Sequence, residues 1–433
     1  MGNKFPEYKQ LNLSAINKEI MELWEKEETF KQSISSRKNK PEYVFYEGPP
    51  SANGKPGIHH VMARAIKDIF CRYKTMTGYK VNRKAGWDTH GLPVELSVEK
   101  TLGITKEDIG KKITVDEYNT TCRKEVMKYT DMWEELTRKM GYWVDMDNPY
   151  ITYDNRYIET LWYLLKKIFD KGLLYKGYTI QPYSPAAGTG LSTHELNQPG
   201  CYRDVKDTVC TAMFKLIANE PYKKIFNDIQ NPIYTLAWTT TPWTLPSNTA
   251  LAVGAEIEYL LIETYNPYLG NKINVVLCKD RLSAYFNPEH EQNELTDYEP
   301  GNKNLPYKIL KSFNGKMLIG LKYEQLINWV KPDGDAFRII AGDYVTTEDG
   351  TGIVHIAPTF GADDLRVAKL AGIAALVLVD NAGQTVPLVD KKGRFTPLNN
   401  IDENFAQKHI NFNEYKDFEG RYVKNEYDQN LSE

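Results

Sequence analysis

Residues 43–78 read YVFYEGPPSANGKPGIHHVMARAIKDIFCRYKTMTG. The first four are aromatic or β-branched and predict a short strand, and a run rich in glycine and proline follows them. Apolar residues recur at helical spacing from about His59, and Gly78 stands where a helix C-terminus favours glycine. The apolar face holds Met62, Ile66, Ile69, Phe70, Tyr73 and Met76. The stretch therefore predicts a strand, a glycine-rich loop and a helix.

Two histidines, His59 and His60, open the predicted helix. A helix N-terminus presents unpaired N–H groups and a partial positive charge, and a loop without bulky side chains lets a polyphosphate approach it. The histidines could add donors to phosphate oxygens. The alternative is an ordinary strand-to-helix turn with two surface histidines, and this stretch alone does not separate the two.

Further elements surround this core. Residues 14–32 show helical spacing after Ser14, a plausible N-cap, and predict a leading amphipathic helix. Residues 79–81 predict a second strand, which completes a βαβ half of a doubly wound fold. Residues 155–170 predict an amphipathic helix that covers the sheet, and residues 173–184 a further strand.

The composition changes from about residue 208 to residue 379. Short β-branched and aromatic runs alternate there with turn residues, which is typical of a mostly β, barrel-like domain. The runs are residues 233–238, 259–262, 273–278, 337–340, 353–356 and 375–379.

Bulk properties narrow the classes of protein. A chain of 433 residues is expected to hold two or three domains, and its net charge of -3 offers no global field for nucleic acid. Any RNA contact would need a local patch; the alternative for such a basic run is a solvated helix face. The candidate run is Lys67, Arg72, Lys74, Lys80, Arg83 and Lys84.

Cysteine spacing and hydropathy exclude other classes. Five cysteines without a Cys-x-x-Cys pair indicate neither a disulfide framework nor a cysteine zinc site. No apolar run approaches the length of a membrane span, and residues 1–11 lack a secretory pattern. We expect a cytoplasmic protein without a membrane partner.

The segment GWDTHGLPVE, residues 86–95, follows the second predicted strand. Ligands of an open parallel sheet bind beyond the carboxyl ends of its strands, so Asp88 and His90 are well placed for a substrate. A carboxylate there could hold the ammonium group of an amino acid. The alternative is a structural aspartate in a turn.

A second chemical region combines two strings, TLAWTTTPWTLPSNTALAV at residues 235–253 and EDGTGIVHIAPTFGADD at residues 348–364. Threonine hydroxyls, His355 and a carboxylate could support hydrolysis, and because no Ser or Cys stands in a nucleophile-elbow context, water is the expected attacking group. The alternative is β-forming threonines with solvated hydroxyls and a structural histidine.

The string PPSANGKPGIHH resembles the ATP-binding segment of class I aminoacyl-tRNA synthetases, in the PPxANGxxHxGH form of isoleucyl-tRNA synthetases. Gly57 stands in place of that pattern's first histidine, and His59 in place of its glycine. GWDTHGLPVE and both strings of the second region resemble the same family. The resemblance implies an α/β fold: the N-terminal half of a class I synthetase Rossmann-like nucleotide-binding fold plus an inserted, mostly β editing domain. The expected boundaries are 1–42 for an N-terminal helix and linker, 43–200 for the nucleotide-binding half and 201–433 for the editing domain.

The resemblance also implies roles for individual residues. ATP would contact Pro50, Asn53, Gly57, His59 and His60. Isoleucine would contact Gly48, Pro49, Asp88 and His90. The editing site would comprise Thr239, Thr240, Thr241, Trp243, Asn248, His355 and Asp364, with Asp364 binding the ammonium of a misattached valine.

The function implied is ATP-dependent ligation of isoleucine to tRNA(Ile), with hydrolytic editing of valyl-tRNA(Ile) by a monomer. ATP would act as a substrate with Mg²⁺; relatives often carry a Cys-x-x-Cys zinc knuckle, and PYSPAAGTG, residues 182–190, has no cysteine, which leaves zinc open only beyond Glu433. The chain resembles an N-terminal fragment and is expected not to form aminoacyl-adenylate alone. The alternatives are a stand-alone editing hydrolase, a tRNA-binding module, or a valyl-tRNA synthetase relative, which GWDTHGLPVE and TTTPWT disfavour.

Overall fold

The computed structural model describes residues 10–424, and the chain divides into two compact units, unit 1 (Met1–Gly177) and unit 2 (Tyr178–Glu433). Each unit has its own buried apolar residues and is described by itself. Within residues 10–424, no helix has both the length and the apolar character needed to cross a membrane.

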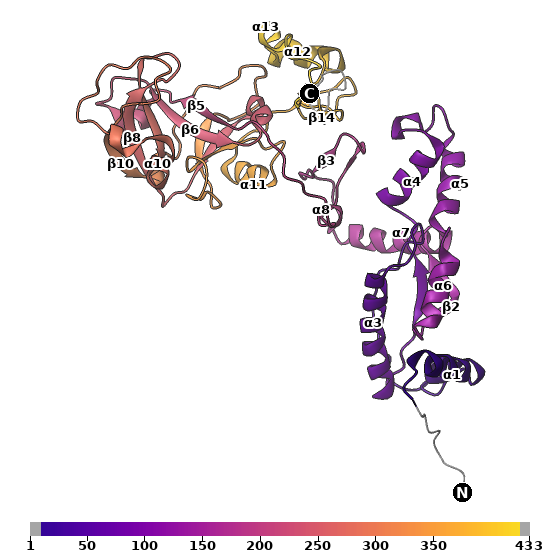
Figure 1. Cartoon of the computed structure of the whole chain (residues 1–433). Helices are drawn as coiled ribbons and strands as arrows, with labels where there is room; N and C mark the ends of the chain where they lie inside the picture. Colours follow the sequence, from indigo (N-terminus) through magenta and orange to yellow (C-terminus); the bar gives the residue numbers. More distant parts are fainter. Residues whose placement is uncertain (1–9, 425–433) are drawn as a thin grey trace. The chain divides into compact units, whose positions relative to one another are not determined.

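Unit 1 is mostly helical and contains a short parallel strand pair, β1 (Lys84–Trp87) with β2 (Asp145–Ile151) (Figure 1). Such a pair needs a crossover connection, here made by the intervening helices. The helices of unit 1 are α1 (Leu13–Lys26), α2 (Thr29–Ser35), α3 (Ile58–Met76), α4 (Leu92–Leu102), the 3₁₀ turn η1 (Lys106–Asp108), α5 (Val115–Val126), α6 (Thr130–Lys139) and α7 (Asn155–Asp170).

The strand predicted at residues 43–46 is wrong. Residues 43–46 form no strand, because no described strand runs along them; the residue before them, Glu42, makes a single bridge with Lys80. Residues 79–81 likewise form one bridge, and the strand forms later, at β1. Of the strand predicted at residues 173–184, only β3 (Tyr183–Ser184) forms, paired with β4 (Thr189–Gly190).

The leading helix is two helices rather than one. The backbone at Glu28 has φ 46°, a left-handed conformation that separates α1 from α2. The N-cap is Asn12 and not Ser14, because the Asn12 side chain accepts a hydrogen bond from the Ala15 N–H at 3.1 Å.

The helix predicted from His59 is confirmed as α3, but its apolar face is turned outward. Met62 and Ile69 are 62% and 65% exposed, whereas Arg64, Cys71 and Thr75 are buried. Helix α7 stacks Tyr157 on Tyr150 of β2, as expected for a helix on the sheet, but it has no buried residue and so covers little of the sheet. A two-stranded sheet is too narrow to bury the apolar stripes of several helices.

The buried side of α3 carries a charge cluster. Asp68 accepts from Arg72 Nε at 2.5 Å and from Arg83 Nη1 at 3.0 Å, and Arg83 also donates to Thr75 Oγ1 at 3.1 Å. The Arg83 side chain is only 5% exposed. At these arginines the basic run is neither a free patch for RNA nor a solvated face.

Unit 2 confirms the expected mostly β domain. A five-stranded sheet has the order β10-β8-β9-β6-β5. Figure 1 labels β5, β6, β8 and β10 of this sheet. A three-stranded sheet has the order β11-β7-β12. Besides β3 and β4, the strands of unit 2 are β5 (Cys210–Lys215), β6 (Ile233–Thr239), β7 (Ala250–Val253), β8 (Glu258–Tyr265), β9 (Lys272–Cys278), β10 (Lys308–Asn314), β11 (Arg338–Ala341), β12 (Ile353–Ile356), β13 (Leu378–Val379) and β14 (Thr385–Val386).

Helices of unit 2 are short and complete two separate apolar cores. Helix α11 (Ala362–Ala371) packs Val367 and Ala368 against Ile340 and Ile356 of the three-stranded sheet. A separate core around Trp329 includes residues of the last two helices. The remaining helices are α8 (Thr193–Leu196), α9 (Glu220–Phe226), α10 (Leu282–Tyr285), α12 (Glu403–His409) and α13 (Phe412–Tyr415), and the 3₁₀ turns are η2 (Pro242–Ser247), η3 (Lys279–Arg281), η4 (Pro288–His290), η5 (Gly315–Met317) and η6 (Leu398–Asn400).

Candidate functional site

Unit 2 contains a polar cavity of about 330 Å³ between the end of β6, the loop before β12 and the first turn of α11. Its volume lies within the range of small-ligand sites, about 300 to 1,000 Å³. The lining includes several hydroxyls and two carboxylates but no Lys, Arg, Ser or Cys. It consists of Trp238, Thr239, Thr240, Thr241, Tyr344, Thr346, Asp349, Gly350, Thr351, Gly352, Ile353, Val354, His355 and Asp364.

The three consecutive threonines occupy the point where β6 ends. Thr239 Oγ1 accepts from the Thr241 N–H at 3.0 Å, and the two hydroxyl oxygens are 3.3 Å apart. Thr240 is exposed at the rim, and Pro242 begins the turn η2 that follows. These hydroxyls are therefore held in a fixed arrangement in which they can bind water or a substrate hydroxyl.

His355 lies on β12 and has both ring nitrogens occupied. Thr244 Oγ1 donates to the Thr241 carbonyl at 2.8 Å, so it accepts from His355 Nε2, 2.9 Å away. His355 Nδ1 faces Asn248 Nδ2 at 3.5 Å. Burial lowers the pKa of His355 to about 4, so the ring is neutral at physiological pH. Because its nitrogens are engaged, His355 is suited to shaping the cavity rather than to moving protons.

His355 also predicts an acid-sensitive stability. The unfolded histidine titrates near pH 6.5 and the folded one at about 4, so between these values only the unfolded state gains a proton and stability falls as the pH falls. The wild type should lose stability between pH 7.5 and pH 4.5, and we expect His355→Gln to reduce this loss in the free energy of unfolding by about 2 to 3 kcal/mol. Urea unfolding at both pH values measures it.

The matched control for this experiment is His290→Gln, at a histidine of the same unit that lies outside the cavity lining. This variant should keep the wild-type pH slope. Equal slopes for His355→Gln and the wild type would mean that the buried ring is protonated in the folded state.

Asp364 faces the cavity from the first turn of α11. Its Oδ2 accepts from the Ala357 N–H at 2.8 Å, and burial raises the pKa of its carboxyl above the usual value. A Cβ on Gly361 would lie 2.6 Å from Asp364 Cγ, so glycine is needed there for the carboxylate to fold back over the helix start. Its neighbour Asp363 is exposed and pairs with Arg366.

The structure thus brings Thr239, Thr240, Thr241, His355 and Asp364 into one cavity.

Trp243 and Asn248 do not line the cavity. The Trp243 ring packs edge-on against Phe360 with centroids 5.0 Å apart. Asn248 is buried behind His355, where its Oδ1 accepts from Tyr323 Oη at 2.7 Å. Its Nδ2 lies 3.5 Å from His355 Nδ1, so Asn248 contacts the histidine without reaching the cavity.

The residues that sequence analysis did not predict for this site include Thr244, Tyr323, Tyr344 and Asp349. Thr244 and Tyr323 form hydrogen bonds with His355 and Asn248, respectively, and each of these partners is more than seventy positions away in the sequence. Tyr344 reaches the cavity through the packing of its ring. Only the position of Thr244 inside the threonine-rich string could have indicated it.

Unit 1 places the histidines as predicted, at the N-terminus of α3. The Gly57 N–H donates to His60 Nδ1 at 2.9 Å, which leaves Nε2–H of the neutral ring free to donate. Burial lowers the pKa of His60, followed by the neighbouring His59 and Arg64, so the neutral ring is favoured. A Cβ on Gly57 would lie 2.8 Å from His59 Cε1, so the His59 imidazole fills the space beside Gly57.

Trp133 of α6, which the sequence analysis missed, anchors the glycine-rich loop. Its Nε1 donates to the Gly54 carbonyl at 2.9 Å, and its ring lies 4.5 Å from that of His60. The Arg64 guanidinium lies 4.7 Å from the same ring. The loop, the helix start and Trp133 therefore form one packed arrangement.

The residues predicted to contact isoleucine are only partly assembled in unit 1. The Asp88 N–H donates to the Pro50 carbonyl at 2.9 Å, which joins this segment to the loop that holds Asn53. His90 instead turns to Thr152, with Nδ1 2.9 Å from Oγ1. Gly48 is exposed, and Pro49 is half-buried.

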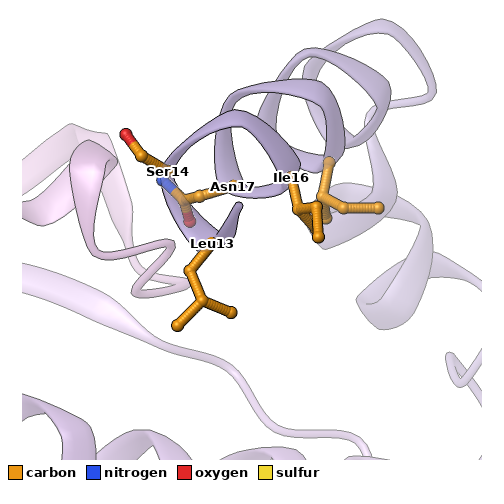
Figure 2. A pocket seen from close by; sticks show the side chains of 5 residues that line it. Leu13, Ser14, Ile16 and Asn17 are labelled. Carbon is orange, nitrogen blue, oxygen red and sulfur yellow. The ribbon is translucent and has the colours of Figure 1, made fainter. Parts of the chain in front are cut away.

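Another hollow lies on α1 and offers no chemistry. Figure 2 shows that Leu13, Ser14, Ile16 and Asn17, which line it, come from a single helix. None of these side chains titrates. Among residues 10–424, no three His, Cys, Asp or Glu side chains are grouped as metal ligands.

Comparison with known proteins identifies the family. The family model for tRNA synthetases class I (I, L, M and V) matches residues 19–424. An isoleucine–tRNA ligase of Bacteroides fragilis is 62% identical over 433 residues, which are 100% of this chain and 38% of that protein. One of Porphyromonas gingivalis is 62% identical over 100% of this chain and 38% of that protein, and one of Cytophaga hutchinsonii is 58% identical over 97% and 36%.

The chain thus spans 36–38% of the length of these relatives. Among solved structures, the editing domain of a P. knowlesi cytosolic leucyl-tRNA synthetase overlaps 38% of this chain and 63% of that chain, with 15% identity and a TM-score of 0.28. That superposition is too loose to support an inference. On the match of the family model across residues 19–424, this chain belongs to the class I tRNA synthetases.

Proposed function

We propose that the chain forms part of an isoleucine–tRNA ligase and that unit 2 hydrolyses valine wrongly attached to tRNA(Ile). The observation that carries this proposal is the cavity in which Thr239, Thr240 and Thr241 face His355 and Asp364. A carboxylate can bind the α-ammonium of an aminoacyl ester, and hydroxyls can hold water or the ribose.

Water is the proposed nucleophile, because the lining contains no Ser or Cys. The ester bond between valine and the ribose would break, with water adding to the carbonyl carbon and the ribose oxygen leaving with a proton. The neutral His355 would bound the space for the amino-acid side chain, so that valine fits and isoleucine does not.

For unit 1 we propose ATP as a substrate, bound at the start of α3. The donors that fit its phosphates are Nε2–H of His60 and the N–H groups at the start of α3. Mg²⁺ would accompany the phosphates and neutralise their charge. Isoleucine and tRNA(Ile) are the proposed partners, and Asp88 is the proposed acceptor for the amino group of isoleucine.

The experiment that tests the hydrolytic proposal is deacylation of valyl-tRNA(Ile) by this chain. We expect release of valine well above the spontaneous rate, with isoleucyl-tRNA(Ile) released much more slowly. Loss of ester is followed with radiolabelled amino acid. A chain that binds the tRNA without releasing valine would instead be a binding module, and equal release of both amino acids would remove the proposed specificity.

A further inference from the structure

The hydroxyl of Tyr344 is a polar group in the cavity that no role above employs. Tyr344 lies in the loop between β11 and β12, and its ring packs against the apolar core beneath α11. Its hydroxyl oxygen is buried and forms no hydrogen bond within residues 10–424. Buried polar groups are nearly always paired, so an unpaired one that lines a cavity indicates a missing ligand.

The charge around Tyr344 specifies what kind of ligand fits. Arg366 donates to both oxygens of Asp343, at 3.0 and 2.6 Å, and also lies 3.4 Å from Asp363. The Arg366 guanidinium lies 6.0 Å from the centroid of the Tyr344 ring, but it is paired with these carboxylates and does not line the cavity. The lining itself holds Asp349 and Asp364 and no basic side chain, so it favours a cation.

Asp364 alone leaves part of an ammonium group unsatisfied. One of its oxygens already accepts from the Ala357 N–H at 2.8 Å, while an ammonium group has three N–H donors. Tyr344 lines the same cavity as this carboxylate, and burial, followed by the charge of Asp364, raises the pKa of the tyrosine hydroxyl. A hydroxyl can donate its hydrogen to a carboxylate and still accept through its oxygen.

We propose that Tyr344 is a second ammonium-binding residue of the cavity. When the ester binds, the Tyr344 hydroxyl donates to Asp364 and accepts one N–H of the α-ammonium, so the two side chains hold the amino end of the aminoacyl ester together. This inference rests on the proposed hydrolytic function and names a further residue that recognises its substrate.

Tyr344→Phe tests the inference on two esters. We expect the variant to hydrolyse valyl-tRNA(Ile) about tenfold more slowly than the wild type, since hydrogen bonds to charged groups have about this effect. N-acetyl-valyl-tRNA(Ile), which has no ammonium, should be a poor substrate of both proteins, at equal rates. A tenfold loss on both esters, or no loss on either, would overturn the assignment.

Thermal melting separates this role from a structural one. Tyr415→Phe is the control, because Tyr415 Oη donates to the Thr396 carbonyl at 2.8 Å in the separate core around Trp329. Tyr415→Phe should lower the melting temperature and leave hydrolysis unchanged, whereas Tyr344→Phe should not lower it. A lower melting temperature for Tyr344→Phe would show that the hydroxyl has a structural partner and would count against the inference.

Binding of 2′-valylamino-2′-deoxyadenosine, an amide that is not hydrolysed, is measured by calorimetry. We expect tenfold weaker binding by Tyr344→Phe. Equal binding by the wild type and Tyr344→Phe would overturn the ammonium assignment. Tight wild-type binding without any release of valine would mean that the hydrolytic function has failed while the ammonium site stands.

Discussion

Asp364→Asn is expected to slow the release of valine from valyl-tRNA(Ile) by at least a factor of about 100. Removing one partner of a buried, hydrogen-bonded charge pair costs about 2 to 5 kcal/mol, which corresponds to roughly 30- to 5,000-fold. The substitution keeps an oxygen that can accept from the Ala357 N–H, so the first turn of α11 should be preserved. The loss would then report the missing charge. The rate of ester loss under single-turnover conditions measures it.

Asp363→Asn is the matched control for this prediction. Asp363 is the preceding residue of the same helix, but its side chain is 66% exposed and pairs with Arg366. Exposed ion pairs contribute little, so the control should stay within about twofold of the wild type. If Asp363→Asn lost as much activity, the relevant factor would be the total charge at the helix start and not a contact made by Asp364.

His355→Ala is expected to let isoleucyl-tRNA(Ile) be hydrolysed and to reduce the preference for the valyl ester by about tenfold or more. The imidazole is 8% exposed and held by Thr244 and Asn248, so it forms a fixed wall of the cavity. This enzyme family is itself the standard example of how weakly size alone discriminates: one methylene in an apolar pocket changes the preference between two substrates by only about 10- to 200-fold. Replacing the imidazole by a methyl group enlarges the cavity by several atoms, so the extra methylene of isoleucine no longer excludes it.

The valyl ester should still be released by His355→Ala, because both ring nitrogens are engaged with protein groups and the pKa of about 4 makes the ring a weak base. Parallel time courses with the two esters measure the ratio, with His290→Ala as the control for a histidine outside the cavity lining. A collapse of valine release without any gain for isoleucine would identify His355 as a proton carrier and contradict its proposed role.

Much of unit 2 could be predicted because β6, β8 and β9 are buried along most of their length. The runs at residues 233–238, 259–262 and 273–278 coincide with β6, β8 and β9, where β-branched and apolar residues leave little ambiguity. The five cavity residues could be named because two recognisable strings supply them. Their meeting depends on β12 lying beside β7, whose chain continues from the threonine string.

The failures have physical reasons. Residues 43–46 have the composition of a strand, but a strand exists only where another backbone lies alongside, which local composition does not report. The spacing in α3 located the helix correctly, yet spacing cannot tell which side is inward when charged residues are buried in pairs. Tyr323 and Tyr344 act through contacts made only after folding, and their surroundings in sequence are unremarkable.

The paired charges on the inner side of α3 constrain how this part of the protein can evolve. Asp68 serves both Arg72 and Arg83, and losing it would leave two guanidinium groups without a counter-charge, one of them almost wholly buried. Single replacements at any of the three positions should be selected against, whereas coordinated ones can be neutral. We therefore expect the residues at these three positions to change together in related sequences.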